Sequence, residues 1–518
     1  MKKKVILFGI DGGTWRLIDK FIKEGAMPNF AYLLENGAKG TLMSTVPALT
    51  LPAWTSIFTG VNPGKHGMTD FLIRVNGKFE LATSNFRQSE SLWKILTRNG
   101  LRSIIINDPV TYPPERINGI MTTGLLTPPY SSYVYPAEVA NEIESVVGGY
   151  EPDLPPDYYE LATTNKPKAY SMLHDFASKI AKATLHLANH HEWDLLAPII
   201  TSTDKLQHFF WNDEDYIRRH YVWLDHFLKD LIDLSHKHNA DLLLVSDHGF
   251  GPAPKALYIN QWLYEMNFQK IKRNILLSLL STAGITRPRL IKILRLLHAY
   301  KFAYWIAQTK IKGLKEVAAF YDKPIDFKNS MAYSESEGIF INDNIASNDY
   351  EKVRNLIIRQ LYEIEDNGVR VVDKVYKREE VIQGKFIQRA PDIFVLLHEG
   401  YVSRYWSNSV NGSDNKSVSD AEALKSGSVE SGGHRPEGIF AAYGSNIRAG
   451  LTVNHIVQTW DITPTILHML GLPIQDYMDG KVLEDIFHPT SEPAKRPVNY
   501  KSQSEAYRIR KLIRMQHF

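Results

Sequence analysis

The chain has 518 residues, of which 44% are hydrophobic, so it can bury the core of one large decorated domain or of about two to four smaller ones. Its formal net charge of +3 is small for this length, so the charge of the whole molecule gives no argument for binding a nucleic-acid duplex or an acidic substrate. Because there is no cysteine, disulfides, thiolate ligands and cysteine nucleophiles are excluded, and any metal must be bound by oxygen and imidazole.

Short apolar runs that end abruptly in polar residues or glycine predict strands buried on both faces. The clearest runs cover residues 5–10, 103–106, 195–200 and 241–245. Helical patterns alternate with them and cover residues 15–35, 91–99, 167–189 and 214–238. This alternation predicts an α/β fold, in which a mostly parallel central sheet is sandwiched by helices and ligands gather at the carboxyl ends of the strands.

The sequence does not predict a segment that crosses a membrane. The lysines at the start precede an apolar run that is too short for a signal peptide, and Asp11 follows it without a cleavage site. The most apolar later stretch, 275–285, is well short of the roughly 20 residues that a spanning helix needs. Since the absence of cysteine also fits a reducing compartment, we expect a cytoplasmic protein, with peripheral contact to a membrane as an open alternative.

Changes in composition divide the chain into four parts. Residues 1–262 and 329–488 have the character of an α/β core, residues 263–328 form a helical insertion or cap, and residues 489–518 form a polar, basic tail. Within the insertion, residues 270–315 contain eleven lysines and arginines and no acidic residue. Three interpretations remain open for this stretch: a soluble helical hairpin, a cap that attracts anionic substrate, or an amphipathic surface that rests on anionic membrane lipid.

Several aspartates and histidines occur where the predicted fold could gather them into a metal site. Asp204 and His208 are four residues apart, so on a helix they share a face, although an isolated pair of this kind is more often an ordinary surface pair. Asp247 and His248 follow the fourth predicted strand, where a buried carboxylate needs a partner such as a cation. Asp11 follows the first strand, although an aspartate before glycines can also form a turn.

Two further residues have a structural and a functional interpretation. His434 lies in a glycine-rich stretch, where an exposed loop histidine is the ordinary interpretation. Thr50 precedes a helical pattern with a proline two residues on, which is typical of a helix N-cap. A threonine hydroxyl beside a metal at a helix N-terminus can also attack phosphorus while backbone N–H groups receive the phosphate.

The order and spacing of these residues resemble a known family. The set comprises Asp11, Thr50, Asp204-x-x-x-His208, Asp247-His248-Gly and Gly433-His434. It resembles the type I phosphodiesterase/nucleotide pyrophosphatase branch of the alkaline phosphatase superfamily, over most of the chain. The stretches 107–114, 124–129, 434–440 and 461–465 look like a prokaryotic subgroup described as predicted phosphodiesterases.

The resemblance implies an alkaline-phosphatase-like core with two divalent metal ions. One ion would be bound by Asp204, His208 and His434, and the other by Asp11, Asp247 and His248, with Thr50 between the ions and touching them. Mixed carboxylate and imidazole ligation favours Zn²⁺, with Mn²⁺ as the alternative. Thr50 would attack phosphorus, and water would then hydrolyse the phospho-threonine. Leu51, through its backbone N–H, and Asn107 are candidates for binding the substrate phosphate.

The implied activity is hydrolysis of a phosphodiester or pyrophosphate bond in a small phosphate ester, a nucleotide, or a lipid- or glycan-linked substrate. The alternative with the same site is a phosphomonoesterase, or a transferase that passes phosphoryl-linked groups to a glycan or lipid. A non-catalytic, metal-containing protein of the membrane surface is a further alternative. Loops and caps around the shared chemistry decide the substrate in such folds, so the sequence leaves the substrate and the oligomeric state open.

Overall fold

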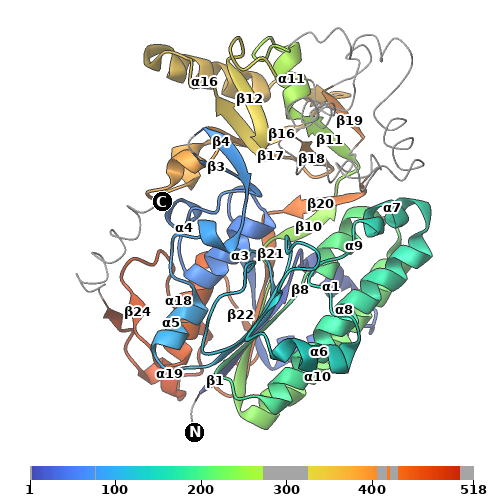
Figure 1. Cartoon of the computed structure of the whole chain (residues 1–518), viewed down its shortest axis with the longest axis vertical. Coiled ribbons are helices and arrows are strands. Elements are labelled where there is room, and N and C mark those ends of the chain that lie inside the picture. Colours follow the sequence, from blue (N-terminus) through green and yellow to red (C-terminus); the bar gives the residue numbers. More distant parts are fainter. Residues whose placement is uncertain (1–2, 76, 272–324, 405–416, 421–429, 502–518) are drawn as a thin grey trace. The chain divides into compact units, whose positions relative to one another are not determined.

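The computed structural model describes residues 3–75, 77–271, 325–404, 417–420 and 430–501 (Figure 1). The chain divides into two compact units. Unit 1 comprises Met1–Gly251, Ile382–Ala390 and Gly432–Phe518, and unit 2 comprises Pro252–Val381 and Pro391–Ser431. Most of the basic insertion expected at 263–328 lies outside the described residues. Among the helices that are described, none is both long and apolar enough to cross a membrane.

A ten-stranded sheet forms the centre of unit 1, with strand order β22-β2-β21-β9-β1-β8-β5-β6-β7 and with β23 paired to β2. The strands are β1 (Lys4–Ile10), β2 (Gly37–Met43), β5 (Ser103–Asp108), β6 (Gly119–Thr123), β7 (Val134–Tyr135), β8 (Leu195–Ile200), β9 (Ala240–Val245), β21 (Glu437–Tyr443), β22 (Leu451–Thr452) and β23 (Val457–Gln458). The run from β9 to β6 is parallel, whereas β21 is antiparallel to β9 and β2. The predicted α/β fold with a mostly parallel sheet is therefore confirmed.

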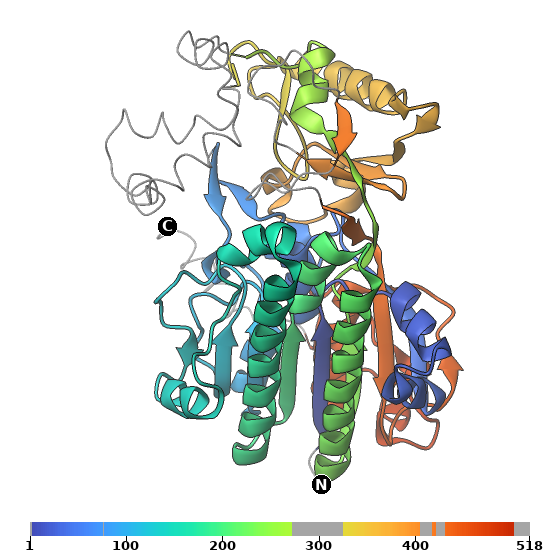
Figure 2. The ribbon, with the colours of Figure 1, turned by 90° about the vertical axis from the view of Figure 1, so that its right-hand side faces the viewer.

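Helices cover both faces of this sheet, and α8 (Lys166–His190) and α10 (Glu214–His238) run alongside each other on one of them (Figure 2). Successive side chains of a strand point to opposite faces. Thus Phe8 of β1 packs edge-to-face on Phe227 of α10, with ring centroids 5.3 Å apart. Its neighbour Leu7 lies in the core cluster that contains Trp54 of α3 (Thr50–Thr59) and Leu467 of α18 (Ile462–Met469).

The helical pattern predicted over 15–35 forms two helices in the structure. Helix α1 (Trp15–Lys23) ends before Gly25, and α2 (Pro28–Glu35) begins at a proline. Gly25 has φ +72°, in the left-handed region that ends many helices, and proline is favoured in the first turn of the next one. The helices predicted at 167–189 and 214–238 are confirmed as α8 and α10.

Unit 2 contains a four-stranded sheet of order β12-β13-β17-β16 and a three-stranded sheet of order β18-β11-β19. These strands are β11 (Lys255–Tyr258), β12 (Ala332–Ser336), β13 (Gly338–Ile341), β16 (Val372–Lys377), β17 (Ile393–Leu397), β18 (Tyr401–Arg404) and β19 (Val418–Asp420). Helices α11 (Ile259–Glu265) and α16 (Ser347–Leu361) contribute Trp262 and Ile357 to its apolar core, together with Ile393 of β17.

Candidate active site

Three neighbouring parallel strands deliver carboxylates to one edge of the unit 1 sheet. Asp11 directly follows β1, and Asp247 lies two residues after β9. Asp204 lies in the first turn of α9 (Ser202–Phe210), the helix that follows β8. Because β1 lies between β8 and β9, the carboxyl ends of these strands meet, and residues far apart in the sequence converge there.

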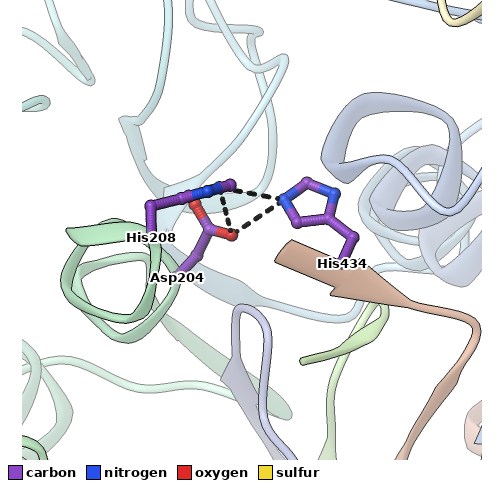
Figure 3. Close-up of side chains that lie close together, drawn as sticks. All are labelled: Asp204, His208 and His434. Carbon is purple, nitrogen blue, oxygen red and sulfur yellow. Dashed lines mark hydrogen bonds and ion pairs between the residues drawn. The ribbon is translucent and has the colours of Figure 1, made fainter. Parts of the chain in front are cut away.

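The first cluster of candidate ligands consists of Asp204, His208 and His434 (Figure 3). The Nε2 atom of His434 lies 3.1 Å from Asp204 Oδ1 and 3.1 Å from His208 Nε2, and His208 Nε2 lies 3.4 Å from the same Asp204 oxygen. Two imidazole nitrogens that face each other and a carboxylate need a shared positive charge, either a proton or a metal ion. Burial opposes ionisation of Asp204, but the contacts with both histidines outweigh it and hold the pKa of Asp204 well below its usual range.

His434 is oriented by a contact on its other ring nitrogen. It lies on the short strand β20 (Gly432–Arg435), and its Nδ1 donates a hydrogen bond to the carbonyl oxygen of Ala48 at 2.9 Å. This contact leaves the lone pair of Nε2 available for a metal, as in many histidine metal sites. Since Ala48 is two residues before Thr50, the same contact ties the first cluster to the candidate nucleophile.

The second cluster is more deeply buried. Asp11, Asp204 and His248 have ligand atoms within 4.8 Å of one another. His248 Nε2 lies 3.5 Å from Asp11 Oδ1 and 3.1 Å from Asp247 Oδ2, and its Nδ1 donates to the carbonyl oxygen of Gly249 at 3.1 Å. The resemblance assigned Asp247 rather than Asp204 to the second cluster. In the structure, carboxylate oxygens of both residues lie near the His248 ring.

The electrostatics of the second cluster favour a bound cation. Burial, and then the charges of Asp247 and Asp204, raise the pKa of Asp11 well above its usual range, and burial does the same to the pKa of Asp247. Burial also lowers the pKa of His248 well below its usual value. Asp11 Oδ1 and Asp247 Oδ2 are buried and form no hydrogen bond with the described part of the chain. Buried carboxylates are costly without compensation, so these residues fit a divalent metal site.

Thr50 lies at the start of α3, beside the candidate ligand His248. Its Oγ1 is 3.5 Å from His248 Nε2, and the side chain is buried. The N-cap interpretation of Thr50 was wrong, because Leu49 is the N-cap residue and Thr50 is the first residue of the helix. Leu51 is the second residue, so its backbone N–H belongs to the first turn, whose N–H groups lack acceptors within the helix.

The structure places Asn107 at the same edge of the sheet, at the end of β5. Its side chain is buried, and Nδ2 donates to Ile199 O and Thr201 Oγ1, each at 3.3 Å. Thr201 is the N-cap residue of α9, the helix that carries Asp204. Every residue that the sequence singled out for the site therefore lies in unit 1.

Sequence reasoning missed Gln207, a buried residue that connects the two clusters. Its Nε2 donates to the carbonyl oxygen of Gly12 at 2.9 Å, and its Oε1 accepts from the hydroxyl of Tyr221 at 2.9 Å. The N–H of Gly12 in turn donates to Asp247 Oδ1 at 3.2 Å. A glutamine between two ligands on one helix was the available signal, but its partner Gly12 is 195 residues away in the sequence.

His66 packs against α3, the helix that begins at Thr50. It is fully buried, its Nδ1 accepts from the Met68 N–H at 3.1 Å, and its Nε2 lies 3.0 Å from Ser56 Oγ of α3. Burial, with the nearby Arg87 charge adding to it, lowers the pKa of His66 to about 3, so this histidine is neutral in the folded protein. It is a structural support for α3.

Several solved structures share the fold of this chain. Human ectonucleotide pyrophosphatase/phosphodiesterase 5 is 15% identical, with a TM-score of 0.54, and the match covers 94% of this chain and 100% of that chain. Its murine counterpart, as an inactive form in complex with AMP, is 14% identical, with a TM-score of 0.52 and the same coverage of 94% and 100%. Phosphonoacetate hydrolase from Sinorhizobium meliloti 1021 is 15% identical, with a TM-score of 0.58 and coverage of 91% and 95%. The fold is thus that of the alkaline-phosphatase-like hydrolases.

The family follows from the sequence itself. The model of the family described as Type I phosphodiesterase / nucleotide pyrophosphatase matches residues 5–420. The chain belongs to this family of metal-dependent hydrolases of the alkaline phosphatase superfamily, which confirms the resemblance seen in the motifs. No curated protein matches the chain.

Proposed function

We propose that the protein hydrolyses a phosphodiester or pyrophosphate bond through a phospho-threonine at Thr50, with two divalent metal ions, both Zn²⁺. One observation carries this proposal: Thr50 contacts the second candidate cluster and lies two residues from a backbone contact with the first. Its Oγ1 lies 3.5 Å from His248, and the carbonyl of Ala48, two residues before it, orients His434 at 2.9 Å. Thr50 is the first residue of α3 rather than its N-cap, so its hydroxyl is not needed to cap the helix.

Each residue has a distinct task in this proposal. Asp204, His208 and His434 would hold one metal, and Asp11, Asp247 and His248 the other. Bound metals would stabilise the charge that develops on the attacking and departing oxygens. Thr50 Oγ1 attacks phosphorus as the bond to the alcohol or phosphate leaving group breaks, and the leaving group takes up a proton. The N–H groups of the first turn of α3, including that of Leu51, bind the phosphate oxygens. Water then hydrolyses the phospho-threonine and frees Thr50.

The substrate is a phosphate ester, and we infer a nucleotide or a related small diester. The family itself and the AMP bound in the murine relative support this choice. A lipid- or glycan-linked phosphate ester is compatible with the same chemistry, since the reaction needs only a phosphorus atom within reach of Thr50.

Release of p-nitrophenol from bis(p-nitrophenyl) phosphate and from p-nitrophenyl phosphate tests the proposal. The protein is stripped of metal, reloaded with Zn²⁺ or Mn²⁺, and compared with Thr50→Ala and Thr50→Ser. We expect metal-dependent cleavage of the diester that falls by roughly three orders of magnitude or more in Thr50→Ala and is partly kept in Thr50→Ser. Thr59→Ala, which removes a buried threonine hydroxyl near the other end of α3, is the matched control.

The outcomes separate the alternatives. Full activity in Thr50→Ala would exclude Thr50 as the nucleophile. A preference of the wild type for the monoester would instead support a phosphomonoesterase. Equal rates with Zn²⁺ and Mn²⁺ would show that the site does not select zinc.

A further inference from the structure

Two buried oxygen atoms at the end of β5 lack partners. Asn107 and Asp108 are the last residues of this strand, and both side chains are at most 2% exposed. Asn107 Oδ1 and Asp108 Oδ1 form no hydrogen bond with any described residue. Buried polar atoms in native proteins are nearly always bonded, so an orphan pair on adjacent residues calls for a ligand. Asp11 and Asp247, in the candidate metal site, have the same property.

Two independent contacts fix this strand end beside the reacting groups. Asn107 Nδ2 donates to Ile199 O, and the next carbonyl of that strand, Ile200 O, accepts from the N–H of Asp11 at 3.1 Å. Asn107 therefore lies one strand away from a candidate metal ligand. Val110, on the turn after the strand, packs in one apolar cluster with Leu51, the residue that follows Thr50.

One residue of the turn has an unfavourable backbone conformation. Val110 has φ +65°, which is a genuine outlier for a β-branched residue, whereas φ +60° at Asn107 is a value that asparagine tolerates. The hydroxyl of Thr111 donates to the carbonyl oxygen of Asp108 at 2.5 Å and holds the turn together. Backbone strain of this kind is concentrated at active sites and ligand-binding turns, where the surrounding structure enforces it.

The chemistry of the two oxygens indicates what they bind. Burial raises the pKa of Asp108 well above its usual range, although the charge of Arg87 opposes this shift. Arg87 is itself bound by Glu115. A carboxyl oxygen and an amide oxygen both accept hydrogen bonds. Hydroxyl groups match this pair, whereas Mg²⁺ or Ca²⁺ would need about six or more oxygen ligands, with charged carboxylates among them.

We propose that Asn107 and Asp108 form a subsite for the hydroxyl groups of the organic part of the substrate, so that the substrate is the phosphate ester of a polyol, such as a sugar or glycerol. This inference rests on the proposed function and adds the class of the esterified alcohol. The proposal assigns Asn107 to the organic group of the substrate rather than to the phosphate. The side-chain amide of Asn107 donates to Ile199 O of β8 and to Thr201 Oγ1, rather than to Thr50 or to a candidate metal ligand.

The test compares three diesters that release p-nitrophenol and differ in the second alcohol, which is methanol, glycerol or the 5′-hydroxyl of uridine. The quantity measured is the ratio of kcat/KM for each polyol ester to that for the methyl ester. We expect the wild type to prefer at least one polyol ester, and Asp108→Ala and Asn107→Ala each to lower that ratio about tenfold. The glycerol and uridine arms distinguish glycerol from a sugar as the preferred alcohol.

Two controls address folding. Asp108→Asn keeps the volume and one side-chain oxygen, and we expect it to give an intermediate ratio. Asp241→Asn alters another buried aspartate of unit 1, near the amino end of β9 and bonded to Asn446, and should leave the ratio unchanged. Circular dichroism and metal content are measured for every variant.

The outcomes distinguish this inference from the proposed function. If the esters are hydrolysed but the ratio does not change in the Asp108 and Asn107 variants, the subsite is refuted and the proposed function stands. Loss of bound metal in the Asp108 variants would make Asp108 a metal ligand and overturn the subsite. If the metal-loaded wild type hydrolyses none of the three esters, the proposed function fails and the inference fails with it.

Discussion

Replacing Gln207 with methionine should damage both the stability and the metal affinity of the candidate site. Gln207 is fully buried and makes the hydrogen bonds to Gly12 and Tyr221, each 2.9 Å long. Methionine keeps the length of the side chain but leaves the Gly12 carbonyl and the Tyr221 hydroxyl proton without these partners. Each unsatisfied buried group costs about 1–3 kcal/mol, so the free energy of unfolding should fall by about 2–6 kcal/mol.

The same substitution should reach the metal through Gly12, whose N–H binds Asp247 at 3.2 Å. Loss of a group that orients a ligand lowers metal affinity about 10- to 100-fold. Urea unfolding of the metal-free protein gives the first quantity, and chelator competition for Zn²⁺ gives the second. Gln475→Met is the matched control, because this buried glutamine of unit 1 donates to Pro473 O at 3.1 Å and, among the described residues, to no group of the candidate site. Wild-type Zn²⁺ affinity in a folded Gln207→Met protein would refute the reasoning.

Three further predictions concern pH, metal and close packing. Because the pKa of His66 is about 3 in the folded protein and 6.5 in the unfolded chain, its contribution to stability is complete above pH 6.5 and is lost toward pH 3, at up to about 1.4 kcal/mol per pH unit. Urea unfolding of His66→Gln between pH 4 and 7 should therefore show a shallower pH dependence than the wild type, and an equal slope would contradict this. Zn²⁺ at about one hundred times its Kd should stabilise the metal-free protein by about 2.7 kcal/mol, which thermal unfolding with and without a chelator measures. Gly249→Ala should impair folding, because its Cβ would lie 2.0 Å from the backbone oxygen of Glu437, whereas Gly251→Ala, whose Cβ would meet the flexible Arg435 side chain at 3.2 Å, should be tolerated in the same unfolding assay.

The central strands and the convergence of the candidate ligands could be predicted from sequence for one physical reason. Strands buried on both faces are continuous apolar runs, and their carboxyl ends share an edge, so Asp11, Asp204 and Asp247 could be grouped before the fold was seen. The antiparallel part of the sheet was not predictable in this way. Strand β2 is Gly37-Ala-Lys-Gly-Thr-Leu-Met43, with few β-branched residues, and its neighbour β21 is hundreds of residues later.

Local signals also failed where a distant partner decides the structure. The ordinary interpretation of His434 was an exposed loop histidine, yet it lies on β20, which pairs with β10 (Gly249–Pro252). Neither strand has a strong strand-forming composition, so the pairing itself defines them. For Gln207, the spacing on α9 indicates neither which neighbour its amide meets nor that the neighbour is a backbone carbonyl.

The path of the chain between the units has a consequence for protein engineering. Unit 2 is not a simple insertion, because the segment Ile382–Ala390 returns to unit 1, where Phe386 N–H donates to Gly64 O at 2.8 Å and Arg389 donates to Gly67 O at 3.1 Å. A gene that joins the paired strands β10 and β20 by a short linker would delete unit 2 at a point where the ends already meet. It would also delete the segment Ile382–Ala390, which packs on residues 64–67 of unit 1. The truncated protein would therefore need the segment Ile382–Ala390 supplied as a separate peptide. The activity of the truncated protein could then report the association of that peptide with unit 1.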